Sequence, residues 1–107
     1  MKFGLKEETI AKICSVFEKN PDVLKVTIYG SRAKGNYRIG SDIDLTLFGT
    51  NLDYNLLKTI EDEIDELDTP YLFDISIYNN LGSESLKEHI DRVGKTFYTR
   101  KNTEDSA

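Results

Sequence analysis

The sequence has few of the residues that support thiol or imidazole chemistry. Its 107 residues include one cysteine, Cys14, one histidine, His89, and no tryptophan. A single cysteine cannot form an intrachain disulfide. Cys14 repeats with Ile10 and Phe17 at helical spacing, so we interpret it as a small core residue rather than a catalytic thiol. His89 lies in a polar segment, which favours a surface position over a role as metal ligand or base.

Long apolar runs and an excess of positive charge are also missing. No run reaches the length needed to cross a bilayer and the start of the chain has no signal-peptide pattern, so we expect a cytoplasmic protein without membrane contact. The net charge is −5, but residues 1–40 carry 8 basic and 4 acidic side chains, whereas residues 41–107 carry 6 and 15. An acidic chain is a poor candidate for binding nucleic acid, whose phosphates attract cationic side chains.

The pattern of apolar residues predicts one domain over residues 1–100 and a flexible tail over 101–107. Helices are expected over 5–19, 31–34, 53–67 and 83–93, and strands over 23–29, 42–48, 71–78 and 96–99. The first strand should place Leu24, Val26 and Ile28 on one face, and Ser31 and Asp53 should cap the helices that begin beside them. This order indicates an α/β (α+β) fold, a small mixed sheet with helices mainly on one face.

Two aspartates open the second predicted strand. Side chains alternate along a strand, so Asp42 and Asp44 project to the same face, roughly 7 Å apart along the backbone. Carboxylates that converge in this way can hold divalent cations, and oxygen ligands suit Mg²⁺. A calcium-binding EF-hand loop is excluded because its sixth position, which must be glycine, is Leu47 inside an apolar strand.

A Gly-Ser turn follows the first predicted strand. Gly30 has no Cβ and allows a phosphate to approach the backbone, and a helix that begins at Ser31 would direct free N–H groups toward the same place. Arg32, Lys34 and Arg38 add positive charge nearby. The Walker pattern Gly-x-x-x-x-Gly-Lys-[Ser/Thr] does not occur. Taken alone, Gly-Ser after a strand is usually only a turn.

The spacing of these two features carries more information than either alone. Gly30-Ser31, ten further residues and then Asp42-x-Asp44 resemble the motif of the DNA polymerase β-like nucleotidyltransferase superfamily. The sequences Gly-Ser-Arg-Ala-x-Gly and Ser-Asp-Ile-Asp-Leu are similar to those of its minimal nucleotidyltransferases (MNT proteins), which pair with helical HEPN proteins in toxin–antitoxin modules. The resemblance covers residues 28–47.

This resemblance implies a third carboxylate on a neighbouring strand. Asp74 is the only acidic residue inside the predicted strand over residues 71–78, and it points away from the apolar face formed by Phe73, Ile75 and Ile77. These features single out Asp74. The alternative is an edge-strand aspartate whose charge prevents aggregation.

The resemblance also implies a reaction, in which two Mg²⁺ ions held by Asp42, Asp44 and Asp74 promote transfer of a nucleoside monophosphate. Gly30, Ser31, Arg32 and Ser41 are the residues expected to bind the nucleotide, with ATP as substrate. AMP would pass to a hydroxyl of the acceptor, such as a tyrosine of a HEPN-type toxin partner, which makes this chain the antitoxin. Two alternatives stay open: a module that acts by contact alone, and transfer to a small molecule.

Overall fold

The computed structural model describes residues 2–100, which form a four-stranded sheet in the order β3-β2-β1-β4. The strands are β1 (Val23–Tyr29), β2 (Ile43–Gly49), β3 (Phe73–Ile77) and β4 (Lys95–Thr99). β1 is antiparallel to both β2 and β4, whereas β2 and β3 are parallel. The sheet is therefore mixed, as predicted, and the predicted tail over residues 101–107 lies outside the described residues.

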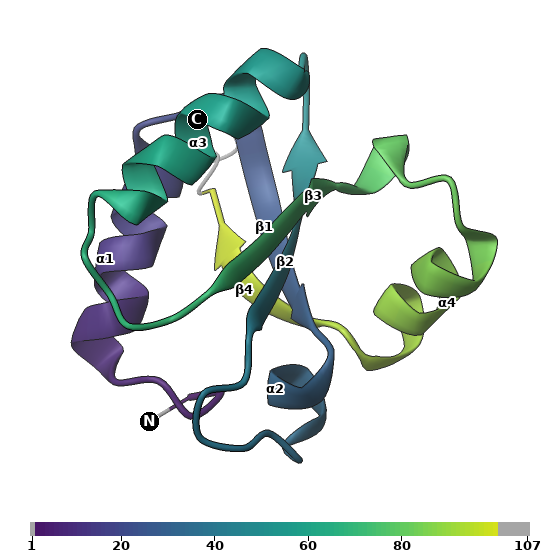
Figure 1. Cartoon of the computed structure of the whole chain (residues 1–107). Coiled ribbons are helices and arrows are strands. Elements are labelled where there is room, and N and C mark those ends of the chain that lie inside the picture. Colours follow the sequence, from purple (N-terminus) through teal and green to yellow (C-terminus); the bar gives the residue numbers. More distant parts are fainter. Residues whose placement is uncertain (1, 101–107) are drawn as a thin grey trace, which may run out of the picture.

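The helices lie on both sides of this sheet. Helices α1 (Glu7–Glu18) and α3 (Tyr54–Asp65) share one face, and α3 is the crossover between the parallel strands β2 and β3 (Figure 1). Helix α4 (Glu84–Val93) lies on the opposite side (Figure 1). The short helix α2 (Ser31–Lys34) follows β1, and a 3₁₀ turn, η1 (Tyr78–Asn80), follows β3. The predicted arrangement, with helices mainly on one face, is confirmed.

The apolar core lies between the sheet and the pair α1 and α3. Its members come from alternate residues of β1 and β2 and from the inward stripes of both helices; they include Ile13, Val16, Phe17, Val26, Ile28, Ile43, Leu45, Leu47, Ile60 and Ile64. Burial of each such side chain contributes about 1.5–3 kcal/mol, so this face of the sheet supplies most of the driving force for folding. The other face carries polar side chains, and α4 packs against part of it.

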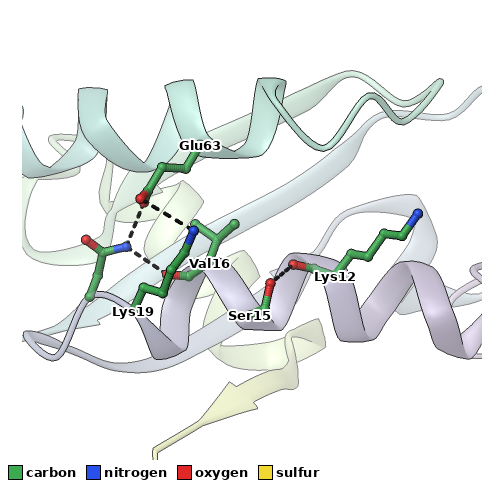
Figure 2. A network of polar contacts seen from close by, with 6 residues as sticks. Lys12, Ser15, Val16, Lys19 and Glu63 are labelled. Atoms are coloured by element: carbon green, nitrogen blue, oxygen red, sulfur yellow. Dashed lines mark hydrogen bonds and ion pairs between the residues drawn. The ribbon is translucent and has the colours of Figure 1, made fainter.

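A small polar network joins the end of α1 to α3 (Figure 2). Glu63 Oε1 accepts a hydrogen bond of 2.9 Å from Asn20 Nδ2, which also donates to the Val16 carbonyl at 2.7 Å. Lys19 Nζ lies 3.7 Å from Glu63 Oε2. Such a partly exposed ion pair contributes at most about 1 kcal/mol. Its effect is to fix the position at which α1 ends against α3.

Arg100, which follows β4, connects the end of the described chain to the region between α1 and β1. Its guanidinium donates to the carbonyls of Val23 (3.0 Å), Phe17 (2.8 Å) and Asn20 (3.1 Å). Phe17 lies in the last turn of α1, where carbonyls have no partner within the helix, so Arg100 adds a donor at the end of α1. The residue after β4 is thereby bound to the first helix and to the start of β1.

Several predicted local details are confirmed, and others need correction. Asp53 Oδ1 accepts from Leu56 N at 2.8 Å and caps α3 as predicted. Leu24 is 44% exposed rather than buried because a bulge between Val23 and Lys25 shifts the register, so Val23 takes the core position. The first helix begins at Glu7, since the residues before it form a short bridge.

No helix within residues 2–100 combines the length and the apolar character required to cross a lipid bilayer.

Candidate active site

One row of side chains crosses three strands at the end of the sheet where β1 finishes and β2 and β3 begin. Tyr29 is paired with Asp44 across β1 and β2, and Asp44 is paired with Asp74 across β2 and β3. All three residues alternate with core residues of their own strands, so they face away from α1 and α3. Asp42 lies just before β2 and is exposed. The three aspartates singled out by sequence therefore lie at one end of one face.

Within residues 2–100, Asp42, Asp44 and Asp74 form no ion pair with a basic side chain. The pKa of Asp44 is raised above its ordinary value by burial, then by the charge of Asp74, and then by that of Asp42. The ion pairs formed within residues 2–100 lie elsewhere, between Lys19 and Glu63 and between Arg92 and Glu88. A half-buried carboxylate with two acidic neighbours and no counter-ion is an environment that favours binding of a cation.

The donor set fits Mg²⁺ in its chemistry, because three carboxylates provide the hard oxygen ligands that this ion prefers. Across residues 2–100, no three acidic, histidine or cysteine side chains are already close enough together to enclose an ion. The backbone register places Asp44 and Asp74 side by side on neighbouring strands.

The raised pKa of Asp44 predicts a pH-dependent penalty in the Mg²⁺-free protein. Folded Asp44 holds its proton more tightly than the unfolded chain does, so stability falls as pH rises from about 3.9, the unfolded value, through the raised pKa. We expect the stability of Asp44→Asn relative to the unsubstituted protein to increase over this pH window and then level off. Urea denaturation in EDTA at a series of pH values measures this difference. A difference that stays constant, or that shrinks as pH rises, would contradict the electrostatic explanation.

Gly30 brings the turn after β1 against Asp44. Its backbone has φ 76° and ψ −154°, a conformation that is essentially restricted to glycine. A Cβ added at Gly30 would collide with Asp44 Oδ2. Gly30, not Ser31, occupies the N-cap position of α2, and Ser31 is the first residue of the helix. Among the described residues, no side chain forms a capping hydrogen bond at this end of α2. The predicted Ser31 cap is therefore wrong, because the chain needs a glycine conformation at the capping position.

The loop between α2 and β2 is held by Arg32, which is only 4% exposed. Arg32 Nε and Nη2 donate to the Ser41 carbonyl at 3.1 and 2.9 Å, and Nη1 donates to the Phe3 carbonyl at 2.8 Å. The rings of Tyr37 and Tyr71 lie 5.4 and 5.1 Å from its guanidinium carbon. This geometry makes Arg32 an anchor for the loop, and a contact with nucleotide stays a prediction.

Ser41, whose carbonyl accepts from Arg32, also forms hydrogen bonds within the loop. Its Oγ accepts from Arg38 N at 2.8 Å and its backbone N–H donates to the Arg38 carbonyl at 3.0 Å. Ser41 immediately precedes Asp42, so the conformation of this loop fixes the backbone position of Asp42 relative to Asp44. Lys34, the last residue of α2, is exposed.

We expect Arg32→Lys to destabilise the protein by about 1–3 kcal/mol, because lysine cannot bond to two carbonyls at once with planar geometry. If Arg32 serves mainly as an anchor, thermal denaturation will show the loss while the affinity for ATP changes little at temperatures where the variant is folded. Lys34→Met removes a nearby charge without removing an anchor and is the matched control. Unchanged stability together with weaker ATP binding would assign Arg32 to the nucleotide instead.

Sequence reasoning missed two members of this neighbourhood. His89, predicted to lie on the surface, is half-buried, and its ring meets the Tyr29 ring edge-on with 6.4 Å between centroids. Burial and the charges of Asp74 and Asp44 raise the pKa of Tyr29, whereas a side-chain hydrogen bond with Ser76 acts to lower it. The only sequence signal for Tyr29 was its place immediately before Gly30. His89 had none, because its contact depends on how α4 packs against the sheet.

The geometry agrees with a family comparison. Residues 11–103 match the model of the family described as polymerase beta, nucleotidyltransferase. The chain belongs to this nucleotidyltransferase family. The family expected from the Gly-Ser and Asp-x-Asp motifs is thus confirmed. No curated protein sequence matches the chain significantly.

Several solved structures with the same fold come from toxin–antitoxin complexes. A toxin–antitoxin crystal structure with AMP-PNP has a TM-score of 0.67 and 20% identity, covering 95% of this chain and 80% of that one. The toxin–antitoxin MntA-HepT has a TM-score of 0.65 and 18% identity, with coverage of 94% and 76%. The tri-AMPylated Shewanella oneidensis HEPN toxin in complex with MNT antitoxin has a TM-score of 0.65 and 18% identity, with coverage of 95% and 77%. At these identities the similarity concerns the fold.

Proposed function

We propose that this nucleotidyltransferase moves AMP from ATP to a tyrosine hydroxyl of a HEPN-type helical partner, and so acts as the antitoxin of a cytoplasmic pair. The observation that carries the proposal is the pairing of Asp44 with Asp74 in register, with Gly30 packed against Asp44. A carboxylate row beside a glycine turn suits a reaction in which a phosphate must approach carboxylate-bound cations closely.

Asp42, Asp44 and Asp74 would hold two Mg²⁺ ions. When bound, these ions would supply positive charge that stabilises the attacking and leaving oxygens of the transfer. The contribution of the chain is to hold the three carboxylates on one rigid face. Asp44 and Asp74 are fixed by the sheet ladder, and Asp42 by the loop that Arg32 anchors.

Asp74 is the residue we assign to the acceptor. It is exposed at the edge strand, whereas Asp44 is half-buried between its neighbours, so a hydroxyl can reach Asp74 from outside. Asp74 would accept the proton of that hydroxyl as general base. The freed oxygen bonds to the α-phosphorus of ATP, the bond from this phosphorus to the bridging oxygen breaks, and pyrophosphate leaves with the electron pair.

The triphosphate would lie at the other side of Asp44, along the turn after β1. Gly30 leaves room for it, and the Ser31 and Ser41 hydroxyls can donate to its terminal phosphates. Arg32 would contribute mainly by shaping this loop, with its charge as a background attraction for the phosphates.

The identity of the acceptor is supported by the chains of similar fold. One of them comes from a complex in which the HEPN toxin is tri-AMPylated, and another from a toxin–antitoxin complex with AMP-PNP. These properties belong to those proteins. Our proposal extends them to this chain because its family and its carboxylate geometry are suited to the same transfer.

The test uses labelled ATP, Mg²⁺ and the protein encoded next to this chain, followed by intact-mass and peptide mass spectrometry of both proteins. We expect the partner to gain one or more AMP units on tyrosine, and Asp42→Asn to add none. A stable complex without transfer would replace the proposal with inhibition by contact alone. Neither transfer nor a complex would overturn the pairing and would leave a small-molecule hydroxyl as the acceptor.

A further inference from the structure

The surface between α3 and β3 has features that the proposed reaction does not use. β3 is an edge strand, so one of its two backbone edges pairs with no strand within residues 2–100. Two hollows, of about 270 and 220 Å³, lie along it, and Ile75 at the middle of β3 lines both. We call this surface the α3–β3 groove. It runs beside the strand that carries Asp74.

The two ends of the α3–β3 groove differ in chemistry. The end near Phe73 is lined by Glu61, Asp62 and Asp65 of α3, against a single lysine, Lys58. The end near Ile77 is lined by Tyr54, Leu57, Ile77 and Leu81. Two exposed apolar side chains mark these ends, Leu72 at 73% exposure and Tyr54 at 69%. The groove is thus acidic at one end and apolar at the other.

We propose that an extended segment of the acceptor protein binds in the α3–β3 groove as a fifth strand, with its acceptor hydroxyl beside Asp74. An unpaired strand edge offers main-chain hydrogen bonds to such a segment, and pockets beside it select alternate side chains. The opposite edge strand, β4, differs in charge, since it begins at Lys95 and is followed by Arg100.

Alternation along an added strand then specifies the acceptor sequence. Asp74 faces away from α3, whereas Phe73 and Ile75 face toward it, so a hydroxyl residue placed beside Asp74 has neighbours that point into the groove. The neighbour at the acidic end should be lysine or arginine, and the neighbour toward Ile77 should be apolar. β3 runs from Phe73 at the acidic end to Ile77 at the apolar end, so for a segment parallel to β3 the groove selects a basic residue, a hydroxyl residue and an apolar residue in that order. This inference rests on the proposed function for the role of the hydroxyl, but binding in the groove does not require transfer.

The binding test needs no ATP. A seven-residue peptide with the central sequence Lys-Tyr-Leu, flanked by threonines, is titrated into the ¹⁵N-labelled chain, and a second peptide has glutamate in place of lysine. We expect amide resonances of β3 to shift with the lysine peptide, those of β4 to stay in place, and the glutamate peptide to bind at least tenfold more weakly. N-methylation of alternate peptide amides should abolish binding for one set of positions and spare it for the other, since only one edge of the peptide faces β3.

Charge reversal in the chain supplies the matched comparison. Asp62→Lys with Asp65→Lys should weaken binding of the lysine peptide at least tenfold. Glu8→Lys with Glu18→Lys makes the same change in net charge on exposed positions of α1 and should leave binding unchanged. If both pairs of substitutions weaken peptide binding equally, the effect comes from net charge, and the proposed binding site in the α3–β3 groove is contradicted.

The outcomes separate this inference from the proposed function. Peptide binding at β3 without AMP transfer to any partner would support binding in the α3–β3 groove and contradict the proposed reaction. AMP transfer to the partner that survives the Asp62→Lys and Asp65→Lys changes, with no shift in β3 at millimolar peptide, keeps the reaction and overturns the groove. Equal loss from N-methylation of either set of amides would also overturn strand addition.

Discussion

Asp44→Asn is expected to reduce nucleotidyl transfer more than about 100-fold, and Asp42→Asn to do the same. Residues that only support a metal ligand cost about 10–100-fold when changed, so removing a ligand itself should cost more. Asparagine has nearly the shape of aspartate, and neither position belongs to the apolar core, so both variants should fold. The rate of AMP incorporation at saturating ATP and Mg²⁺, measured beside far-UV circular dichroism, gives both quantities.

Asp53→Asn is the control for this pair. Asp53 caps α3 through a hydrogen bond to Leu56 N, and asparagine caps helices equally well, so the variant loses a carboxylate without losing structure or activity. Transfer at an unchanged rate in Asp42→Asn or Asp44→Asn would remove these residues from the reaction. Raising the Mg²⁺ concentration should recover part of the activity if the defect lies in holding the ion.

Gly30→Ala is expected to have the second largest effect, because it acts on stability and on the site together. The backbone conformation at Gly30 costs about 1–3 kcal/mol for any residue with a side chain. The added Cβ would also displace the Asp44 carboxylate. A displacement of about 1 Å can lower a rate about 100-fold, so transfer should fall by roughly this factor in the fraction that remains folded.

Gly35→Ala separates the two contributions. Gly35 also has a positive φ, 86°, but among the described residues no atom beyond Gly35 and its chain neighbours lies within 4 Å of the place that its Cβ would occupy. This variant should lose about 1–2 kcal/mol from backbone strain alone and should keep its transfer rate. Equal rates in the two alanine variants would mean that the contact between Gly30 and Asp44 does not matter for the reaction. Urea denaturation and initial rates on the same samples provide the comparison.

Much of the fold could be read from the sequence because its elements follow simple periodicities. Ile43, Leu45 and Leu47 alternate with polar residues, and all three are at most 1% exposed. The strand order and the position of α4 could not be obtained in this way, since they depend on contacts between distant segments. The exposure of Leu24 has the same origin, because a bulge depends on the register of two strands.

The candidate site was predictable to the extent that its residues are close in sequence. The placement of Asp42 and Asp44 at the start of a strand follows from local alternation, and that of Asp74 from its being the one charge in an apolar strand. The burial of Arg32 could not be predicted, because its partners Phe3 and Tyr71 are far away along the chain. A basic residue near a glycine turn looks the same in sequence whether it binds phosphate or backbone.

The position of Arg100 has a consequence for how the chain folds during synthesis. The central strand β1 is made early, but one of its two neighbours, β4, and the donor for the end of α1 are among the last described residues to be made. Contacts of such long sequence separation form late and slow the folding of small domains. Asp44 on β2 and Asp74 on β3 therefore leave the ribosome before β4 can pair with β1 to complete the sheet. Cooperative protection from protease should appear only once residue 100 has emerged from the exit tunnel.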